Sequence, residues 1–115
     1  MKKEDIIFVE HILDSLNKIE KFIDNFSERK FLEDEKLQDA VIRRIEIIGE
    51  AAKNISSDFK KKYPNVPWVK ITGMRDKLIH HYFGINLKII WNVIKEDIPM
   101  LKREIILILK KESNN

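Results

Sequence analysis

The sequence predicts an all-α protein, an up-and-down bundle of four to five helices. Apolar residues recur at spacings of three and four along almost the whole chain, which is the period of an amphipathic helix. Only three Gly and three Pro interrupt this pattern, and no strand signal competes with it. At 115 residues the chain has the size of one domain. We expect that domain to span residues 1–110, followed by a frayed tail over residues 111–115.

The first two predicted helices each carry one apolar stripe. The first should run from Lys3 to Phe26 and the second from Asp34 to Ser56. The stripe of the first helix comprises Val9, Ile12, Leu16, Ile19, Ile23 and Phe26, and that of the second comprises Leu37, Val41, Ile45, Ile48, Ala52 and Ile55.

A polar connector over residues 57–66 leads to the third predicted helix. A short helical turn is possible over residues 58–62, and Pro67 can open the next helix because the first helical position needs no amide proton. Gly84 favours the positive φ that stops a helix, so the third helix should span residues 67–83.

The fourth predicted helix begins after Asn86, a good N-cap residue. Pro99 falls inside this helix, where it removes one hydrogen bond and predicts a kink. The apolar stripe continues on both sides of the proline and comprises Leu87, Ile90, Ile94, Ile98, Leu101, Ile105 and Ile108.

The second helix is apolar over an unusually wide part of its surface, which predicts a homodimer. Ala40, Ile42, Ile47 and Ala51 widen its stripe and leave a narrow charged strip formed by Arg43, Glu46 and Glu50. A helix that is apolar nearly all round needs more than one neighbour to cover it.

Composition excludes several kinds of site. There is no Cys, so a disulfide, a thiolate metal site and a Cys nucleophile are unavailable. The three His are not grouped with carboxylates at a ligand spacing, so no metal site is expected. Twenty-two basic and 19 acidic residues give a mixed surface of net charge +3, which alone does not indicate nucleic-acid binding. No signal-peptide core or membrane-spanning stretch is present, and we expect a cytoplasmic protein with no membrane contact.

One short segment combines the groups that phosphodiester chemistry needs. Arg75, His80 and Tyr82 follow the pattern Arg-x4-His-x-Tyr. An Arg can grip a phosphate, a His can carry a proton near pH 7, and a Tyr offers a hydroxyl. Without further information Arg75 could equally be a guanidinium at the edge of the core, paired with Glu46 or Glu50, and Tyr82 a half-buried ring.

These residues, with the blocks around them, resemble the HepT-like family. This family is the ribonuclease-toxin half of HepT/MntA-type toxin–antitoxin modules, within the HEPN superfamily of Arg-x4-6-His ribonucleases. The matching blocks are residues 40–54, residues 66–68 and residues 73–76 with 80–84, and they stand in the family's order.

The resemblance implies a metal-independent endoribonuclease, the toxin of a type VII toxin–antitoxin system, that needs no cofactor. His80 would carry the proton of the attacking ribose 2′-hydroxyl or of the leaving oxygen, and Arg75 would stabilise the charge on the phosphorus. Tyr82 would accept AMP from an MntA-type nucleotidyltransferase antitoxin, and this modification would switch the toxin off. In this interpretation RNA is the substrate and the partner enzyme uses the ATP.

Helix geometry raises a difficulty for a site within one chain. On a regular helix, His80 lies about 140° around the axis from Arg75, so the two would not converge on one phosphate. Two copies of the motif that meet across a dimer cleft would remove the difficulty, as the family resemblance implies. Asp76 lies four residues before His80 and could orient its imidazole, or could be an ordinary surface residue. We assign no role to His11 or His81.

Two alternatives remain. The chain could be a non-catalytic helical module that binds nucleotide and presents substrate to a nucleotidyltransferase partner. It could also be a purely structural bundle in which the motif is incidental. RNA cleavage that depends on His80 distinguishes the ribonuclease from both.

Overall fold

The structure is a computed structural model that describes the backbone of residues 3–80 and 86–114, and the side chains of residues 3–76 and 86–114. In this part of the chain all regular structure is helical, so the predicted all-α class is confirmed. The helices are α1 (Lys3–Ile23), α2 (Glu28–Glu33), α3 (Glu35–Asn54), α4 (Ser57–Lys62), α5 (Trp68–His80), α6 (Leu87–Asn92), the π-helical segment η2 (Val93–Asp97) and α7 (Ile98–Ser113).

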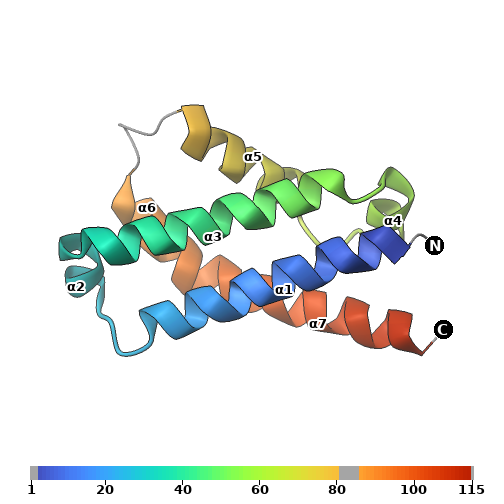
Figure 1. Cartoon of the computed structure of the whole chain (residues 1–115), viewed down its shortest axis with the longest axis horizontal. Coiled ribbons are helices and arrows are strands. Elements are labelled where there is room, and N and C mark those ends of the chain that lie inside the picture. The colour runs from blue at the N-terminus through green and yellow to red at the C-terminus, as the bar shows by residue number, and fades with distance from the viewer. Residues whose placement is uncertain (1–2, 81–85, 115) are drawn as a thin grey trace.

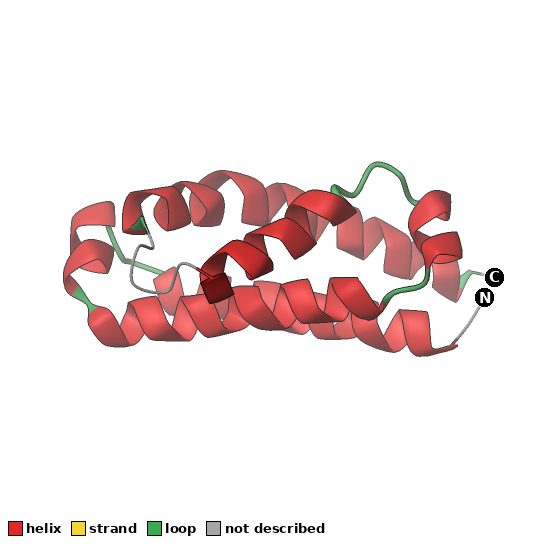
Figure 2. Ribbon diagram, turned by 90° about the horizontal axis from the view of Figure 1, so that it is seen from above, coloured by secondary structure: helices red, strands yellow, loops and turns green. Residues whose placement is uncertain are grey.

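The long helices α1, α3 and α7 extend along the length of the molecule, and α1 packs against both of the others (Figure 1). α1 and α3 run in opposite directions, and the N- and C-terminal ends of the chain lie at the same end of the molecule. α5 packs on α3 and crosses it obliquely, as the view from above shows (Figure 2). α3 is therefore in contact with α1 on one side and with α5 on another.

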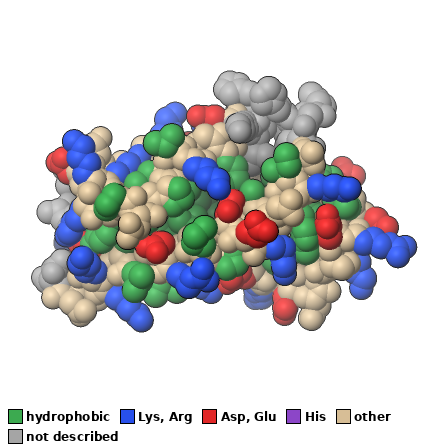
Figure 3. All heavy atoms as spheres, turned by 180° about the vertical axis from the view of Figure 1, so that it is seen from behind, with side chains coloured by type: hydrophobic (Ala, Val, Ile, Leu, Met, Phe, Trp, Pro, Cys, Tyr) green, Lys and Arg blue, Asp and Glu red, His purple; other side chains and the backbone are tan. Residues whose placement is uncertain are grey.

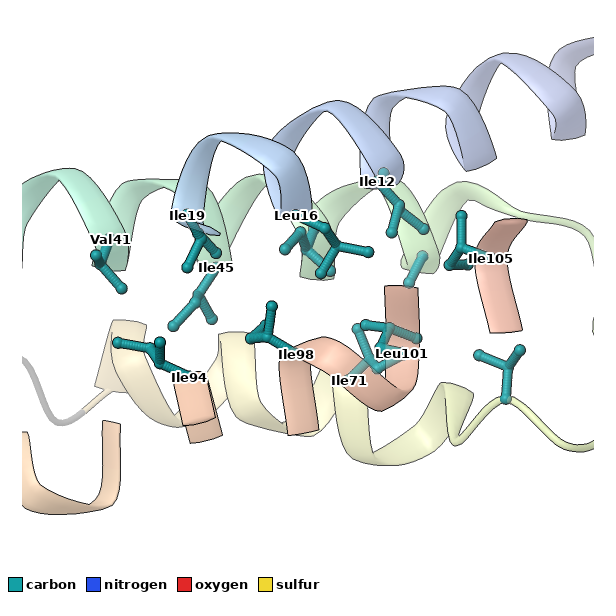
Figure 4. Close-up of a cluster of buried hydrophobic side chains, with 14 of the residues drawn as sticks. Ile12, Leu16, Ile19, Val41, Ile45, Ile71, Ile94, Ile98, Leu101 and Ile105 are labelled. Atoms are coloured by element: carbon teal, nitrogen blue, oxygen red, sulfur yellow. The ribbon is translucent and has the colours of Figure 1, made fainter. Parts of the chain in front are cut away.

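The core forms where the apolar stripes of these helices meet (Figure 4). Ile12, Leu16 and Ile19 of α1 are fully buried, and they face residues of α3 and α7. Burial of one such side chain contributes about 1.5–3 kcal/mol, so the core provides the main stabilisation of the fold. The stripe residues predicted from periodicity are buried in α3 and α7 as well: Leu37, Val41, Ile45, Ile48, Ala52, Ile98, Leu101, Ile105 and Ile108.

The sequence interpretation missed α2. α1 ends at Ile23, three residues earlier than predicted, and Asn25 turns the chain with a positive φ of 66°. Ser27 then caps a short helix by accepting a hydrogen bond from the Lys30 backbone N–H (3.2 Å). Phe31 of this helix is fully buried and lies against Trp91 of α6, with ring centroids 5.3 Å apart. α2 thus closes one end of the core.

The N-termini of α3 and α4 are set by polar caps. Asp34 accepts a hydrogen bond from the Leu37 N–H (3.0 Å), which fixes the start of α3. Ser56 caps α4, the short helix expected within the connector, and is itself held by Asp5 of α1. The Asp5 carboxylate, 3% exposed, accepts from the backbone N–H (2.8 Å) and the hydroxyl (2.7 Å) of Ser56. These two hydrogen bonds tie the beginning of α1 to the residue that follows the end of α3.

Pro99 is accommodated by the π-helical segment that precedes it. Asn86 caps α6 as predicted, and the Ile98 N–H then donates to the Val93 carbonyl, five residues back. The wider turn makes room for the proline ring, which would otherwise press against the carbonyl four residues before it. α7 continues to Ser113, into the segment expected to be a frayed tail.

Contacts with α4 hold the end of α7 in place. The Glu112 carboxylate accepts hydrogen bonds from the Tyr63 hydroxyl and from the Lys62 ammonium group (3.0 Å). Burial, together with the hydrogen bond to Glu112 and the charge of that carboxylate, raises the pKa of Tyr63 to about 12. Burial alone would raise the pKa of Glu112, but the bonds from Tyr63 and Lys62 and the charge of Lys62 outweigh it and lower that pKa.

Part of the reason for expecting a homodimer is removed by the structure. Of the residues that widen the apolar surface of the second helix, Ile42 and Ala51 are buried within the single chain, whereas Ala40 and Ile47 are half-buried. A second copy is not needed to cover the first two.

The surface carries charges of both signs. On the face seen from behind in Figure 3, Lys and Arg side chains are interspersed with Asp and Glu, as the nearly balanced composition indicates. Within residues 3–80 and 86–114, no helix combines the length and apolar character needed to cross a membrane.

Candidate functional site

Arg75 lies on α5 at a place where this helix is in close contact with α3. Gly49 of α3 faces the stem of Arg75, and a Cβ at position 49 would lie 2.2 Å from Arg75 Cβ and 2.7 Å from its Cγ. Real Cβ atoms do not approach other carbons so closely. The absence of a side chain at Gly49 therefore creates the space in which the Arg75 stem packs, and the core side chain Ile71 is one turn earlier on the same helix.

Two carboxylates hold the guanidinium of Arg75. Its Nη2 lies 2.9 Å from Glu50 Oε2, and its Nη1 lies 3.2 Å from Asp76 Oδ1. The Arg75 side chain is 23% exposed, whereas those of Glu50 and Asp76 are more than half exposed. The stem is thus fixed by packing, and the charged end is oriented by partners that stay in contact with water. Such ion pairs are weak, so an incoming phosphate can compete for the guanidinium.

Of the three predicted supporting residues, Glu50 and Asp76 contact Arg75. The sequence allowed an ion pair of Arg75 with either Glu46 or Glu50, and the structure shows the pair with Glu50. Glu46 has no ion-pair partner among the described residues. Asp76 was expected to orient His80, and in the structure it contacts Arg75 instead. Because the side chain of His80 is outside the described part, an Asp76–His80 contact stays a prediction.

The remaining motif residues are placed only in part. His80 is the last residue of α5, so the backbone of the segment from Arg75 to His80 is helical. Five residues of α-helix turn the chain by about 500°, which leaves the two Cα atoms about 140° apart around the axis. Tyr82 lies outside the described residues, as do His81 and Gly84.

A groove of about 360 Å³ adjoins the guanidinium between α1 and α3. Arg75 and Glu50 line it where α5 meets α3, and further along it is lined by Glu46 and Arg43 of α3 and by His11 of α1. The charged strip predicted on the second helix therefore faces a concave surface. No group of three or more His, Asp or Glu in the described part of the chain is arranged to hold a metal ion.

Sequence reasoning missed Gly49 and gave His11 no role. Gly49 could have been noticed, because a Gly in the middle of a helix costs about 0.5–1 kcal/mol relative to Ala and must be offset by a packing requirement. For His11 no such signal existed. It is an exposed residue of α1, and only the tertiary packing of α1 on α3 brings it to the groove that contains Arg75.

Comparisons with known proteins show a family match over most of the chain. The family model described as "Ribonuclease HepT-like" matches residues 12–108. The chain is 48% identical over 102 residues to "Probable ribonuclease HepT" of Thermococcus cleftensis, covering 89% of this chain and 93% of that protein.

A second relative is a longer protein. The chain is 47% identical over all of its 115 residues to "Gamma-glutamylcyclotransferase and putative RNase" of Methanocaldococcus jannaschii, and spans only 52% of that protein. No solved structure is significantly similar to the chain.

Proposed function

The chain belongs to the ribonuclease HepT-like family, and from this premise we propose that it is a metal-independent endoribonuclease, the toxin of a type VII toxin–antitoxin system. The observation that carries the proposal is the state of Arg75. Its stem is packed against Gly49, its guanidinium is oriented by Glu50, and the end of the side chain is open to a groove. A fixed guanidinium beside a groove suits the stabilisation of a phosphate whose charge increases during reaction.

The proposed reaction is attack of a ribose 2′-hydroxyl on the adjacent phosphorus. His80 takes the proton of the 2′-hydroxyl or gives one to the departing 5′-oxygen, while Arg75 binds the nonbridging oxygens that gain charge. The P–O5′ bond breaks as the 2′-O–P bond forms, which leaves a 2′,3′-cyclic phosphate and a 5′-hydroxyl. The need for a 2′-hydroxyl restricts the substrate to RNA.

We propose further that the complete site contains two copies of the chain. The Cα atoms of Arg75 and His80 lie about 140° apart around the axis of α5, so the two positions are on different sides of this helix. In a homodimer that brings the two α5 helices together, Arg75 of one protomer and His80 of the other can face the same phosphate. The angular separation of the two positions on α5, rather than an uncovered surface on α3, is the observation that supports a dimer.

Tyr82 is the proposed regulatory residue. It follows His80 by two residues, in the spacing of the family motif, and its phenol offers an oxygen that can attack the α-phosphate of ATP. The partner is a nucleotidyltransferase of the MntA type, which would transfer AMP to the phenol and release pyrophosphate. The added phosphate would compete for Arg75 and the nucleotide would occupy space needed by RNA, so modification would stop cleavage.

RNA cleavage by the purified protein tests the proposal. Wild-type protein should cut RNA in the presence of a chelator and leave a cyclic phosphate, and His80→Ala should not cut. Cleavage of the corresponding DNA, or an undiminished rate in His80→Ala, would contradict the mechanism. Binding of RNA without cleavage by wild type would favour a non-catalytic module that serves the nucleotidyltransferase.

A further inference from the structure

The groove beside Arg75 has a composition that phosphate binding alone does not explain. Its apolar surface comes from Phe8 of α1 and from Ile47 and Ala51 of α3. A track for the phosphate backbone would be lined by cations, whereas this groove also contains Glu46 and Glu50. Its volume of about 360 Å³ lies within the range of small-ligand sites, roughly 300–1,000 Å³.

The apolar part of the groove suits a flat ring. Phe8 lies edge-to-face against His11, with ring centroids 6.2 Å apart and an interplanar angle of 82°. Phe8 and Ile47 are half-buried, so each has part of its apolar surface available to a ligand, while Ala51 is buried and contributes no bulk. Aromatic and aliphatic side chains of this kind bind nucleobases by stacking and contact with the ring face.

The polar groups present complementary hydrogen-bonding partners for one kind of base. Glu46 offers two carboxylate oxygens and, among the described side chains, no cation is paired with them. Arg43 is three residues earlier on α3 and lines the same groove with a donor. Asn54 uses its amide N–H to bond the Glu50 carbonyl (2.8 Å), which leaves its side-chain oxygen as an acceptor.

We propose that this groove is a nucleobase subsite that selects guanine next to the cleaved phosphate. Guanine is the RNA base that carries two neighbouring donors, N1–H and the 2-amino group, and these match the two oxygens of Glu46. Its O6 and N7 acceptors match Arg43. The groove continues to Arg75, so a guanosine whose base lies there places its phosphate toward the guanidinium. The inference rests on the proposed ribonuclease function, because it uses Arg75 as the phosphate partner.

Binding of two mononucleotides tests the subsite without depending on cleavage. Guanosine 3′-monophosphate and inosine 3′-monophosphate differ only in the 2-amino group. Calorimetry with wild-type protein should give about tenfold tighter binding of the guanosine nucleotide, the size expected for a bidentate base contact. Glu46→Gln should reduce this ratio to near one. Glu96→Gln, which removes the same charge from an exposed position of η2, should keep the wild-type ratio.

The outcomes separate the subsite from the enzymatic activity. Equal affinity of wild type for the two nucleotides, or an unchanged ratio in Glu46→Gln, overturns the subsite even if the protein cuts RNA. A guanosine preference that depends on Glu46 supports the subsite even if RNA is not cut, in which case the ribonuclease proposal fails alone. If neither nucleotide binds and Glu46→Gln changes the sedimentation coefficient, the groove is an interface between copies and the subsite is wrong.

Discussion

Gly49 of α3 and Arg75 of α5 face each other, and the space between the two helices holds only one side chain at this contact. A Cβ at position 49 would lie 2.2 Å from Arg75 Cβ, so only one of the two positions can carry a β-carbon. Arg75 is thereby packed against α3, the helix that is in contact with both α1 and α5. A group that must stabilise a transition state benefits from such fixed placement.

Gly49→Ala should damage both stability and activity. Overpacking typically costs about 1–3 kcal/mol, whereas the better helix propensity of Ala returns at most about 1 kcal/mol. Urea unfolding should therefore show a net loss, and kcat should fall because Arg75 is displaced. In an Arg75→Gly background the clashing Cβ and Cγ are absent, so Gly49→Ala should there be neutral or stabilising. An equal loss in both backgrounds would show that the contact with Arg75 is not the cause.

Gly73→Ala provides the matched control. Apart from its chain neighbours and the nearby backbone of its own helix, a Cβ at Gly73 would meet no atom of the described residues within 4 Å, and Gly73 lies in the same helix as Arg75. The substitution should raise the free energy of unfolding by about 0.5–1 kcal/mol through helix propensity alone. RNA cleavage should stay at the wild-type rate.

Arg75→Ala should abolish cleavage and leave the fold intact. Its two ion pairs join partly exposed groups and are worth about 0–1 kcal/mol each, so helical circular dichroism should be unchanged. Loss of a single donor to a developing oxyanion typically lowers kcat by about 10²–10³. Arg75→Lys should recover little, because an ammonium group cannot form two parallel bonds to a phosphate. A collapsed fold in Arg75→Ala would mean that the guanidinium is structural.

Complementation between two inactive variants tests the two-chain site. If each site takes Arg75 from one protomer and His80 from the other, a heterodimer of Arg75→Ala and His80→Ala contains one intact site and one that lacks both groups. An equal mixture that exchanges subunits freely should regain about a quarter of wild-type activity. A site within one chain gives no recovery. Sedimentation at micromolar concentration should show about twice the chain mass, and a clean monomer contradicts the two-chain site.

The Tyr63–Glu112 hydrogen bond should limit stability at both ends of the pH range. The folded pKa of Glu112 is below its usual 4.5, so its contribution is present above pH 4.5 and is lost as the pH falls through the folded pKa. The pKa of Tyr63 is raised from 10.0 to about 12, so its contribution is lost as the pH rises through that interval. The urea midpoint should be measured as a function of pH. In Tyr63→Phe the decline of the midpoint at alkaline pH should be lost, and in Glu112→Gln the part of its decline at acid pH that Glu112 causes should be lost.

Tyr82→Phe should separate modification from packing, since it keeps the ring and removes only the hydroxyl. Intact-mass analysis after incubation with the nucleotidyltransferase and ATP should show added AMP on wild type and none on the variant. If Tyr82 is only an acceptor, the variant should stay toxic and escape neutralisation. If the phenol also contacts RNA, the variant should be unmodified and less active. Equal AMP incorporation in the two proteins would refute the assignment.

Periodicity predicted the parts of the fold that depend on burial. The stripes of α1 and α3 were found because an amphipathic helix places its apolar residues on one side, whatever it packs against. α2 was missed because six residues are too few to show a helical period, and its single buried residue, Phe31, looked like part of a loop. Its cap, Ser27, was the one local signal present.

In the candidate site, too, only some of the contacts could be predicted from the sequence. Arg75 and its partner Glu50 could be named because a charge on an apolar helix face requires a nearby carboxylate. The contact between Asp76 and Arg75 could not be predicted. Neighbouring residues point about 100° apart on a helix, and only the bend of a long side chain brings these two together. The groove depends on how α1 lies against α3, which no spacing within either helix records.

The π-helical segment makes the end of the fold sensitive to chain length. Ile94 lies within the wide turn and Ile98 directly after it, and both are buried in the core, although the apolar residues around them are spaced for an α-helix. Removal of one residue from 93–97 would restore ordinary α-helical winding with α7 in nearly the same orientation, because a π turn takes one residue more than an α turn. It would also press the Pro99 ring against the carbonyl four residues before it. At the exposed positions Lys95 and Glu96, the number of residues is therefore under stronger constraint than their identity.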